Sequence, residues 1–228
     1  AEKPSVFGIL KEWGVHKGVV AALVNGKPTD LRTLLDFDAV IEPIAADSEE
    51  GLHVLRHSAS HLMAQAVLHL YPGTKVAIGP SIKDGFYYDF ELPVPICEED
   101  LAGIEEEMHK LAKAALPVER LEIPRGELLA RYEAAGEVYK AELVREITDE
   151  KISVYRQGDF EDMCRGPHVP DTSFLKHTKL LSVAGAYWRG DEKNIMLTRL
   201  YGTAFADKGG LEAYLKRMEE ARRRDHRK

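Results

Sequence analysis

The sequence predicts an α+β protein, because segments with helical periodicity alternate along the chain with short runs of strand formers. With 228 residues, of which 44% are hydrophobic and 30% charged, the chain can bury one large core or two smaller ones. It contains no run of about 18 apolar residues, and its first residues do not resemble a secretion signal. We therefore expect a globular cytoplasmic protein with no membrane partner.

Residues 1–46 are predicted to form a small α+β module. A helical stretch at 6–13 precedes a run of strand formers at 19–24, and the Asn25-Gly26 dipeptide that follows is a good hairpin signal. A module of roughly 45 residues is marginal for independent stability. We expect it to pack on its neighbour or to lack part of its own fold.

A long helix is predicted next, and it carries two histidines on one face. Asp47 followed by Glu50 resembles a capping box, and Pro72-Gly73 ends the apolar stripe that follows. His57 and His61 are separated by four positions, so their side chains project from the same side of this helix.

The rest of the chain predicts a mainly antiparallel sheet with helices packed on it. Strands are expected at 86–90, 118–123, 152–155, 179–186 and 194–200, and helices at 95–115 and 127–135, with 138–146 left unassigned. The final helix has an apolar stripe, formed by Leu211, Tyr214, Leu215, Met218 and Ala221.

The formal net charge of −7 argues against a protein that holds nucleic acid by bulk electrostatics. Any contact with RNA must therefore be local. Lys and Arg gather within 216–228, a pattern that by itself is typical of a solvated helix face. Cys97 and Cys164 lie far apart in the sequence, and we expect no structural disulfide.

The most informative pattern joins His57-Ser58-Ala59-Ser60-His61 to the later segment Cys164-Arg165-Gly166-Pro167-His168. Three imidazoles and one thiol are the ligand types that a tetrahedral zinc ion prefers. Each piece alone is more often structural, but together His57, His61, Cys164 and His168 predict one site. Neither the helical metalloprotease motif nor the nucleobase deaminase motif is present. Six further histidines show no such grouping and are assigned to structure or surface: His16, His53, His69, His109, His177 and His226.

Several motifs together closely resemble the editing domain of bacterial threonyl-tRNA synthetases, also called the second additional domain. They are Arg56 to Leu62, Ala77 to Pro80, Gly85 to Asp89, Asp162 to Pro170 and Ala184 to Asp191. Residues 201–207 and 224–228 resemble the end of that domain and the helix leading into a class II catalytic core. Residues 1–46 resemble a ubiquitin-like TGS module without its opening β-hairpin.

The resemblance implies three parts: a TGS-like module at 1–46, incomplete at its N-terminus, an editing domain at 47–210, and a linker helix at 211–228. The linker would lead to class II catalytic and anticodon-binding domains that lie outside this sequence. The implied reaction is hydrolysis of the ester in mischarged seryl-tRNA(Thr), whose acceptor end would be the partner. No ATP site is expected in this region.

The family pattern also implies roles for individual residues. The catalytic positions would be His57, His61, Lys140, Asp162, Cys164 and His168, and the substrate-binding positions Tyr88 and Arg165. Members of this family work without zinc, whereas the related alanyl-tRNA editing domains bind it. The resemblance therefore leaves two possibilities, no cofactor or zinc held by His57, His61, Cys164 and His168.

These residue types suit ester hydrolysis. A neutral histidine can accept or relay a proton, and Lys140 can stabilise developing negative charge. A thiolate needs an activating base or cation, so Cys164 ranks lower as a nucleophile than as a ligand or positioning group. Two alternatives stay open: a noncatalytic tRNA-binding accessory module with a structural metal site, and a free-standing hydrolase related to alanyl-tRNA editing proteins.

Overall fold

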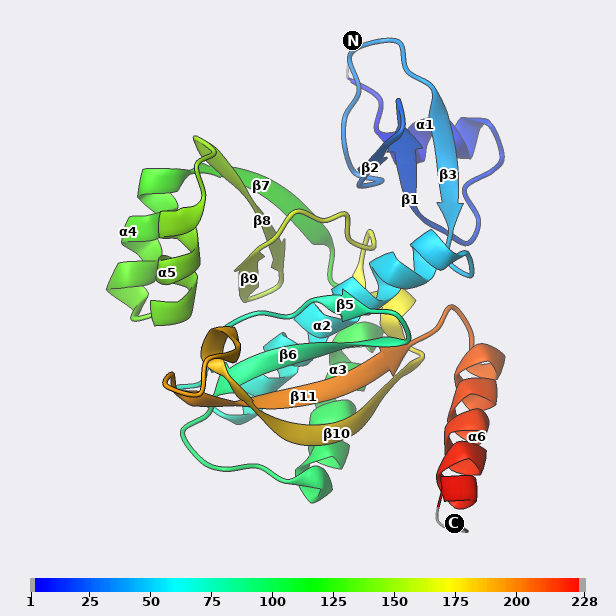
Figure 1. Ribbon diagram of the computed structural model, residues 1–228. Coiled ribbons are helices and arrows are strands. Elements are labelled where there is room, and N and C mark those ends of the chain that lie inside the picture. The colour runs from blue at the N-terminus through cyan, green and yellow to red at the C-terminus, as the bar shows by residue number, and fades with distance from the viewer. Residues whose placement is uncertain (1–2, 226–228) are drawn as a thin grey trace.

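The computed structural model describes residues 3–225 and confirms the α+β class, with helices packed on three antiparallel sheets (Figure 1). The chain begins with helix α1 (Val6–Glu12) and strands β1 (Val19–Val24), β2 (Lys27–Thr29) and β3 (Ile41–Ala45). Their sheet has the order β2-β1-β3. Asn25 and Gly26 both have positive φ, 50° and 76°, which is the two-residue hairpin that the sequence predicts.

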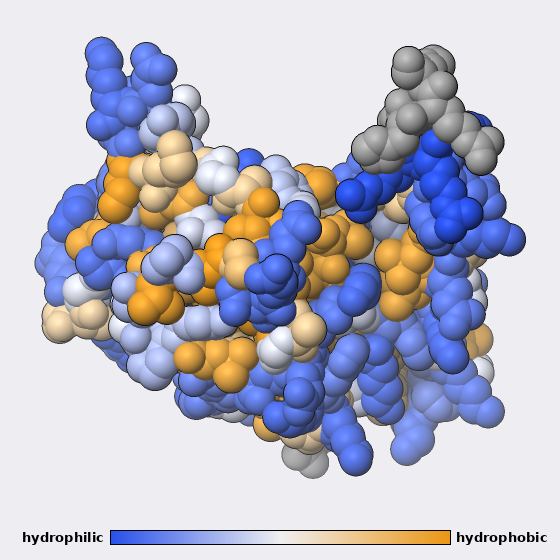
Figure 2. Space-filling view, turned by 90° about the horizontal axis from the view of Figure 1, so that it is seen from below, coloured by the Kyte–Doolittle hydropathy of each residue, from blue (hydrophilic) through white to orange (hydrophobic). Residues whose placement is uncertain are grey.

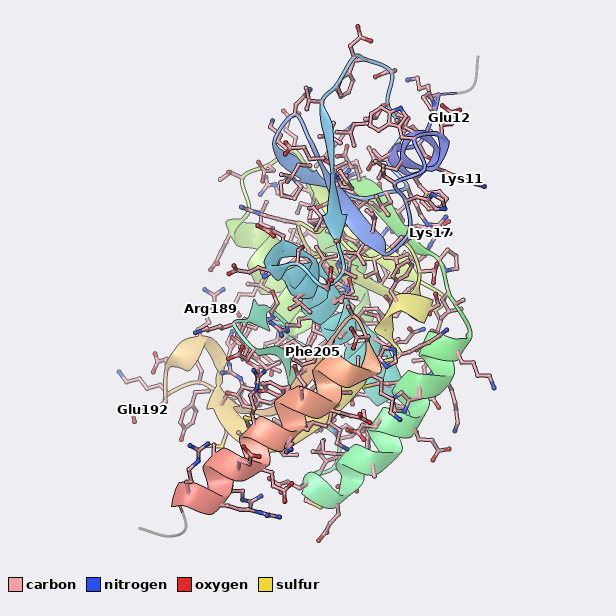
Figure 3. The ribbon with its side chains drawn as sticks, turned by 90° about the vertical axis from the view of Figure 1, so that its right-hand side faces the viewer. Lys11, Glu12, Lys17, Arg189, Glu192 and Phe205 are labelled. Carbon is pink, nitrogen blue, oxygen red and sulfur yellow. The ribbon has the colours of Figure 1, made fainter. Side chains whose placement is uncertain are left out.

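This N-terminal module has two buried faces. Val6, Leu10 and Val19 belong to its own small core. Val20 and Ala21, on β1, pack instead into the main core of the protein together with residues of the next helix. The module therefore leans on its neighbour, as its small size predicts. The charged side chains of Lys11, Glu12 and Lys17 point away from the body of the molecule (Figure 3).

The predicted long helix is α2 (Glu49–Leu70), which runs through the centre of the molecule. Its cap differs from the prediction: the Ser48 hydroxyl accepts a hydrogen bond from the Gly51 amide at 3.0 Å, so the cap is Ser48 and not Asp47. From Val54 to Val67 every residue except His57 is buried, because elements pack around the helix on all sides.

A five-stranded sheet lies against α2. It contains β4 (Lys75–Val76), β5 (Ser81–Ile82), β6 (Gly85–Glu91), β10 (Thr178–Tyr187) and β11 (Met196–Ala204). The order is β10-β11-β6-β4, with β5 paired to β6. Helices α2 and α3 (Leu101–Lys113) cover one face of this sheet (Figure 1). Phe86, Tyr88 and Phe90 alternate along β6 and are fully buried against that layer.

A second, separate sheet departs from the prediction of one main sheet. Its strands are β7 (Val118–Pro124), β8 (Lys151–Gln157) and β9 (Phe160–Met163), in the order β7-β8-β9. Helices α4 (Arg125–Ala135) and α5 (Val138–Glu146) connect β7 to β8, so the unassigned segment at 138–146 is helical. This part of the fold has its own hydrophobic core, which includes Leu128, Val144 and Val154. Elsewhere in the described part of the chain, 3-10 turns occur at Glu98–Asp100, Thr172–Leu175 and Trp188–Gly190.

The last helix, α6 (Lys208–Asp225), lies at the edge of the molecule, away from α4 and α5 (Figure 1). It contacts the body through Tyr214, whose ring lies 5.4 Å from that of Phe205. Its predicted apolar stripe is only partly covered, since Met218 is 48% exposed. His226, Arg227 and Lys228, with the predicted extension of the helix through them, lie outside the described residues.

Hydrophobic and hydrophilic residues are interspersed on the face of the molecule that is seen from below (Figure 2). No helix within residues 3–225 combines the length and the apolar character needed to cross a membrane. Cys97 and Cys164 are both free, in agreement with the prediction of no disulfide.

Candidate functional site

The structure brings the predicted histidine–cysteine cluster together. His57 and His61 come from α2, and Cys164 and His168 come from the loop that follows β9. Their ligand atoms all lie within 4.8 Å of one another, which confirms the predicted convergence. The loop turns at Gly166, whose φ of +68° is a conformation that glycine adopts easily.

His168 is the most firmly held member of the cluster. Its Nδ1 lies 3.0 Å from the Ser58 hydroxyl, and its Nε2 lies 3.0 Å from the Cys164 sulfur. The Ser58 oxygen also accepts a hydrogen bond from the Val169 amide at 3.1 Å. The sequence pattern alone assigns no role to Ser58. Its position between the two helix histidines was the only available signal, because its partners lie more than a hundred residues away.

A buried polar chain extends from the cluster to Lys140, on α5. The Lys140 ammonium is 2.5 Å from Oδ1 of Asp162, and the Tyr88 hydroxyl donates to Oδ2 of Asp162 at 2.5 Å. Nε2 of His61 lies 3.7 Å from the same Oδ2. Lys140 is only 3% exposed, so it is not a surface lysine. These buried polar side chains connect Lys140 to the imidazole of His61 through the carboxylate of Asp162.

Burial controls the protonation of the site. It lowers the pKa of His57 to about 4 and that of His61 to about 3, and it holds the pKa of His168 well below its ordinary value. These imidazoles are therefore neutral at neutral pH, with lone pairs available to take a proton or bind a cation.

The carboxyl group of Asp162 and the thiol group of Cys164 differ in protonation state, although burial acts in the same direction on both. Burial acts to raise the pKa of Asp162, but the charge and hydrogen bond of Lys140, together with His61 and the Tyr88 hydroxyl, lower that pKa below the ordinary value. Burial and the nearby Asp162 charge raise the pKa of Cys164. Asp162 is thus a carboxylate and Cys164 a protonated thiol, which makes Cys164 a poor nucleophile.

A cleft of about 320 Å³ opens in front of the cluster. Among the predicted site residues it is lined by His57, His61, Lys140, Asp162 and Cys164, with Ile78, Gly79, Pro80, Leu143 and Met163 completing its walls. His168 is buried behind it. The protein can therefore present imidazole nitrogen, ammonium and carboxylate groups to a small molecule.

Two predicted substrate contacts are not on this cleft. Tyr88 is fully buried and reaches Asp162 from behind the wall, because strand β6 directs it into the core. Arg165 is exposed and lines a neighbouring hollow of about 210 Å³ with Arg120 and Lys151. Cys164 lines both this hollow and the cleft, whereas Arg165 lines only the hollow.

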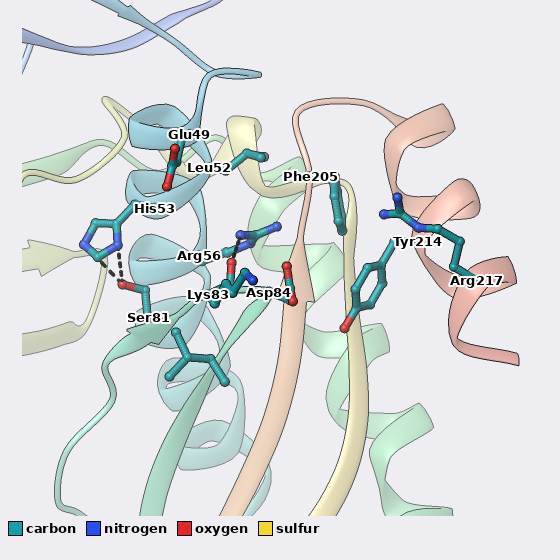
Figure 4. Close-up of a pocket in the computed structure, with 11 residues that line it drawn as sticks. Glu49, Leu52, His53, Arg56, Ser81, Lys83, Asp84, Phe205, Tyr214 and Arg217 are labelled. Atoms are coloured by element: carbon teal, nitrogen blue, oxygen red, sulfur yellow. Dashed lines mark hydrogen bonds between the residues drawn. The ribbon is translucent and has the colours of Figure 1, made fainter. Parts of the chain in front are cut away.

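A larger hollow of about 660 Å³ lies between the first half of α2, the β5–β6 turn and α6 (Figure 4). The Ser81 hydroxyl contacts the His53 ring at 3.0 Å, and the Arg56 guanidinium donates to the Lys83 carbonyl at 2.5 Å. None of the predicted site residues lines this hollow. Size therefore does not identify the chemical site, which is defined by the smaller cleft and its titratable groups.

The chain resembles an accessory domain of aminoacyl-tRNA synthetases. Residues 152–201 match the family described as the threonyl and alanyl tRNA synthetase second additional domain. Over nearly its whole length the chain is also similar to proteins named threonine–tRNA ligase. That of Nitratidesulfovibrio vulgaris (strain DSM 19637 / Miyazaki F) is 57% identical over 213 residues, and that of Citrifermentans bemidjiense is 54% identical over 215 residues.

A third relative, from Rubrobacter xylanophilus, is 56% identical over 212 residues. The three alignments cover 93%, 94% and 93% of this chain, and 33%, 34% and 33% of the relatives. The chain is thus similar over nearly its whole length to threonine–tRNA ligases and spans about a third of the length of these relatives.

Proposed function

We propose that the cleft hydrolyses the ester of mischarged seryl-tRNA(Thr), releasing serine and tRNA(Thr), as the editing region of a threonine–tRNA ligase. The observation that carries this proposal is the pairing of neutral, buried imidazoles with the Lys140–Asp162 ion pair at one small cleft. Residues 47–210 would form the editing domain, 1–46 a TGS-like module and 211–228 a linker. The partners would be the tRNA acceptor end and the class II catalytic and anticodon-binding domains of a longer chain.

In this mechanism His57 is the first candidate to take the proton of the attacking water. It is the most exposed imidazole of the cluster, and its lowered pKa keeps the nitrogen unprotonated. Lys140 stabilises the oxyanion that develops on the ester carbonyl, and Asp162 holds the ammonium in place. His57 then returns the proton to the ribose oxygen as it leaves. Cys164 keeps its proton and positions His168.

Selectivity for serine would reside in the cleft wall. Serine differs from threonine by one methyl group, which is worth only about 1–3 kcal/mol in a single binding pocket. A hydrolytic cleft that excludes the methyl group at the β-carbon would remove the wrong product and spare the right one. Asp162 is on the cleft and ionised, so it is the candidate to bind the amine of the seryl group.

The cluster also fits zinc, since one thiol and three imidazole donors lie within 4.8 Å of one another. When bound there, zinc supplies a Lewis acid or, with all four positions filled by protein, a structural cross-link. Four donors favour a filled coordination sphere, which supports a second candidate function: a noncatalytic tRNA-binding accessory module with a structural metal site.

One assay separates these functions. The purified chain is incubated with seryl-tRNA(Thr) and threonyl-tRNA(Thr), with and without a chelator. We expect release of serine, little release of threonine and no effect of the chelator. A chain that hydrolyses neither ester, and unfolds when chelator is added, would be the accessory module instead. Equal activity on seryl-tRNA(Ala) would indicate the alanyl-tRNA-editing type of hydrolase. His57→Ala is the control for catalysis by this cleft.

A further inference from the structure

Asp30 of the N-terminal module contacts the loop that carries Cys164 and His168. Asp30 follows β2, and its carboxylate accepts two hydrogen bonds from residues outside the module. The His168 backbone amide donates to Oδ1 at 2.8 Å, and the Tyr155 hydroxyl donates to Oδ2 at 2.6 Å. One carboxylate therefore joins the module, strand β8 and the loop of the cluster.

Both bonds help to position His168, one through its backbone amide and the other through Tyr155. The Tyr155 ring packs on the His168 ring, with centroids 4.4 Å apart. Tyr155 also supports the loop itself, because a Cβ atom at Gly166 would collide with the Tyr155 hydroxyl. Asp30 thus fixes the backbone of His168 directly and fixes its ring through Tyr155, while Ser58 holds Nδ1 from the helix side.

The docking of the module does not depend on Asp30. Val20, Ala21 and Ile44 pack into the main core and keep the module in place by apolar contact. A second polar contact between module and loop is made by Arg32, whose Nε donates to the Pro170 carbonyl at 2.9 Å. That carbonyl also accepts from the Val118 amide at 3.0 Å, so it keeps a partner without Arg32.

We propose that Asp30 is a positioning residue of the candidate site, so that the N-terminal module completes the site instead of only preceding it. Asp30 lies outside residues 152–201, the segment that matches the family of the second additional domain. Its two bonds hold the cluster in the arrangement that hydrolysis requires. The catalytic consequence rests on the proposed function, whereas the effect on the loop does not.

The test compares three variants of the 228-residue chain. Asp30→Ala removes both bonds, and we expect kcat for seryl-tRNA(Thr) hydrolysis to fall by ~10- to 100-fold, as for other residues that orient a reactive histidine, with little change in KM. Asp30→Asn keeps an oxygen for the His168 amide, and the Tyr155 hydroxyl can turn to accept from the new amide group. It should retain most of the activity. Arg32→Ala is the matched control and should behave like the wild type.

Hydrogen exchange of the segment 164–169 gives a readout that does not depend on activity. We expect faster exchange in Asp30→Ala and wild-type exchange in the other two variants. Wild-type kcat and exchange in Asp30→Ala would overturn the proposal. So would an equal loss in Arg32→Ala, which would mean that module docking is what matters. If the wild type hydrolyses no ester, the proposed function fails, and exchange alone decides: faster exchange in Asp30→Ala supports positioning, and unchanged exchange refutes it.

Discussion

Lys140 and Asp162 form an ion pair, 2.5 Å between Nζ and Oδ1, in which the side chains are only 4% and 3% exposed. Removing two charges from water is unfavourable unless the geometry is good and further polar partners are present. Tyr88 supplies such a partner to Asp162 and also lies 3.1 Å from the Lys140 ammonium. The pair is thus a buried unit in which either charge alone would be poorly tolerated.

Lys140→Ala should therefore reduce both stability and turnover. The buried Asp162 carboxylate loses its counterion, which costs about 3–5 kcal/mol of the free energy of unfolding. The transition state loses an electrostatic contact that is typically worth a hundredfold or more in rate. Urea unfolding and single-turnover deacylation of seryl-tRNA measure the two effects.

The double variant Lys140→Ala/Asp162→Asn separates stability from catalysis. Neutralising Asp162 should restore part of the stability but none of the turnover, because no ammonium remains at the cleft. If Lys140→Ala deacylates at the wild-type rate while His57→Ala is inactive, then Lys140 has no role in the reaction.

The neutral histidines predict how stability depends on pH. Burial lowers the pKa of His57 to about 4 and that of His61 to about 3, from an ordinary value of 6.5. As the pH falls below 6.5, His57 and His61 become protonated in the unfolded chain but stay neutral in the native protein. The free energy of unfolding should then fall by on the order of 1 kcal/mol per pH unit for each such histidine, until the native pKa is reached.

Urea titrations between pH 7 and 4, in the presence of a chelator, test this slope, and His57→Gln should make it shallower. His69 is a control of opposite sign. Glu107, together with Asp159, raises its pKa, so its contribution is present below pH 6.5 and is lost as the pH rises through the raised value. A wild-type slope in His57→Gln would contradict the assignment.

Gly166→Ala should be more harmful than a matched substitution elsewhere. Gly166 and Gly136 both have positive φ, +68° and +71°, so alanine at either site carries a backbone penalty of about 1–2 kcal/mol. Only at Gly166 does the added Cβ meet another group, the Tyr155 hydroxyl. We expect Gly136→Ala to lose stability alone, and Gly166→Ala to lose more stability and also deacylation. Equal decreases in melting temperature for the two variants would show that the loop accommodates the added Cβ without further loss of stability.

Charge reversal of Arg222, Arg223 and Arg224 to glutamate should weaken the use of intact tRNA. These side chains are exposed on α6, and Arg223 makes only a surface pair with Glu219. Contacts to phosphate add affinity without taking part in the chemistry, so KM for seryl-tRNA should rise while hydrolysis of a small seryl ester is unchanged. An equal loss on both substrates would point to misfolding instead.

The elements with strong local signals could be predicted from the sequence. The Asn25-Gly26 hairpin, the helix at 49–70 and the strand at 85–91 each follow from a turn signal or a periodic pattern. Short strands such as β4 and β5 could not be predicted, since two residues contain no period. The cap was assigned one residue early because Asp47 and Ser48 are both good capping residues and only the fold chooses between them.

The candidate site was predictable where its residues share a motif. His57, His61, Cys164 and His168 were found because each pair has a spacing that places both members together. Lys140 and Asp162 came only from the family resemblance, since nothing in the surrounding sequence predicts that a lysine will be buried. Asp30 and Ser58 were missed because their partners lie 138 and 110 positions away, a separation over which local patterns carry no information.

The single helix α2 constrains how this protein can change during evolution. His61 faces the cluster, and one turn later the Gln65 side chain accepts a hydrogen bond from the Gln157 side-chain amide at 3.0 Å and donates to Asp159 at 2.7 Å. One residue inserted between His61 and Gln65 would rotate everything beyond it by about 100°. Either the histidines or the glutamine would then face the wrong neighbours. Insertions and deletions should therefore be absent from this stretch of the gene in functional homologues, even where point substitutions accumulate, and length variation should be confined to the surface loops.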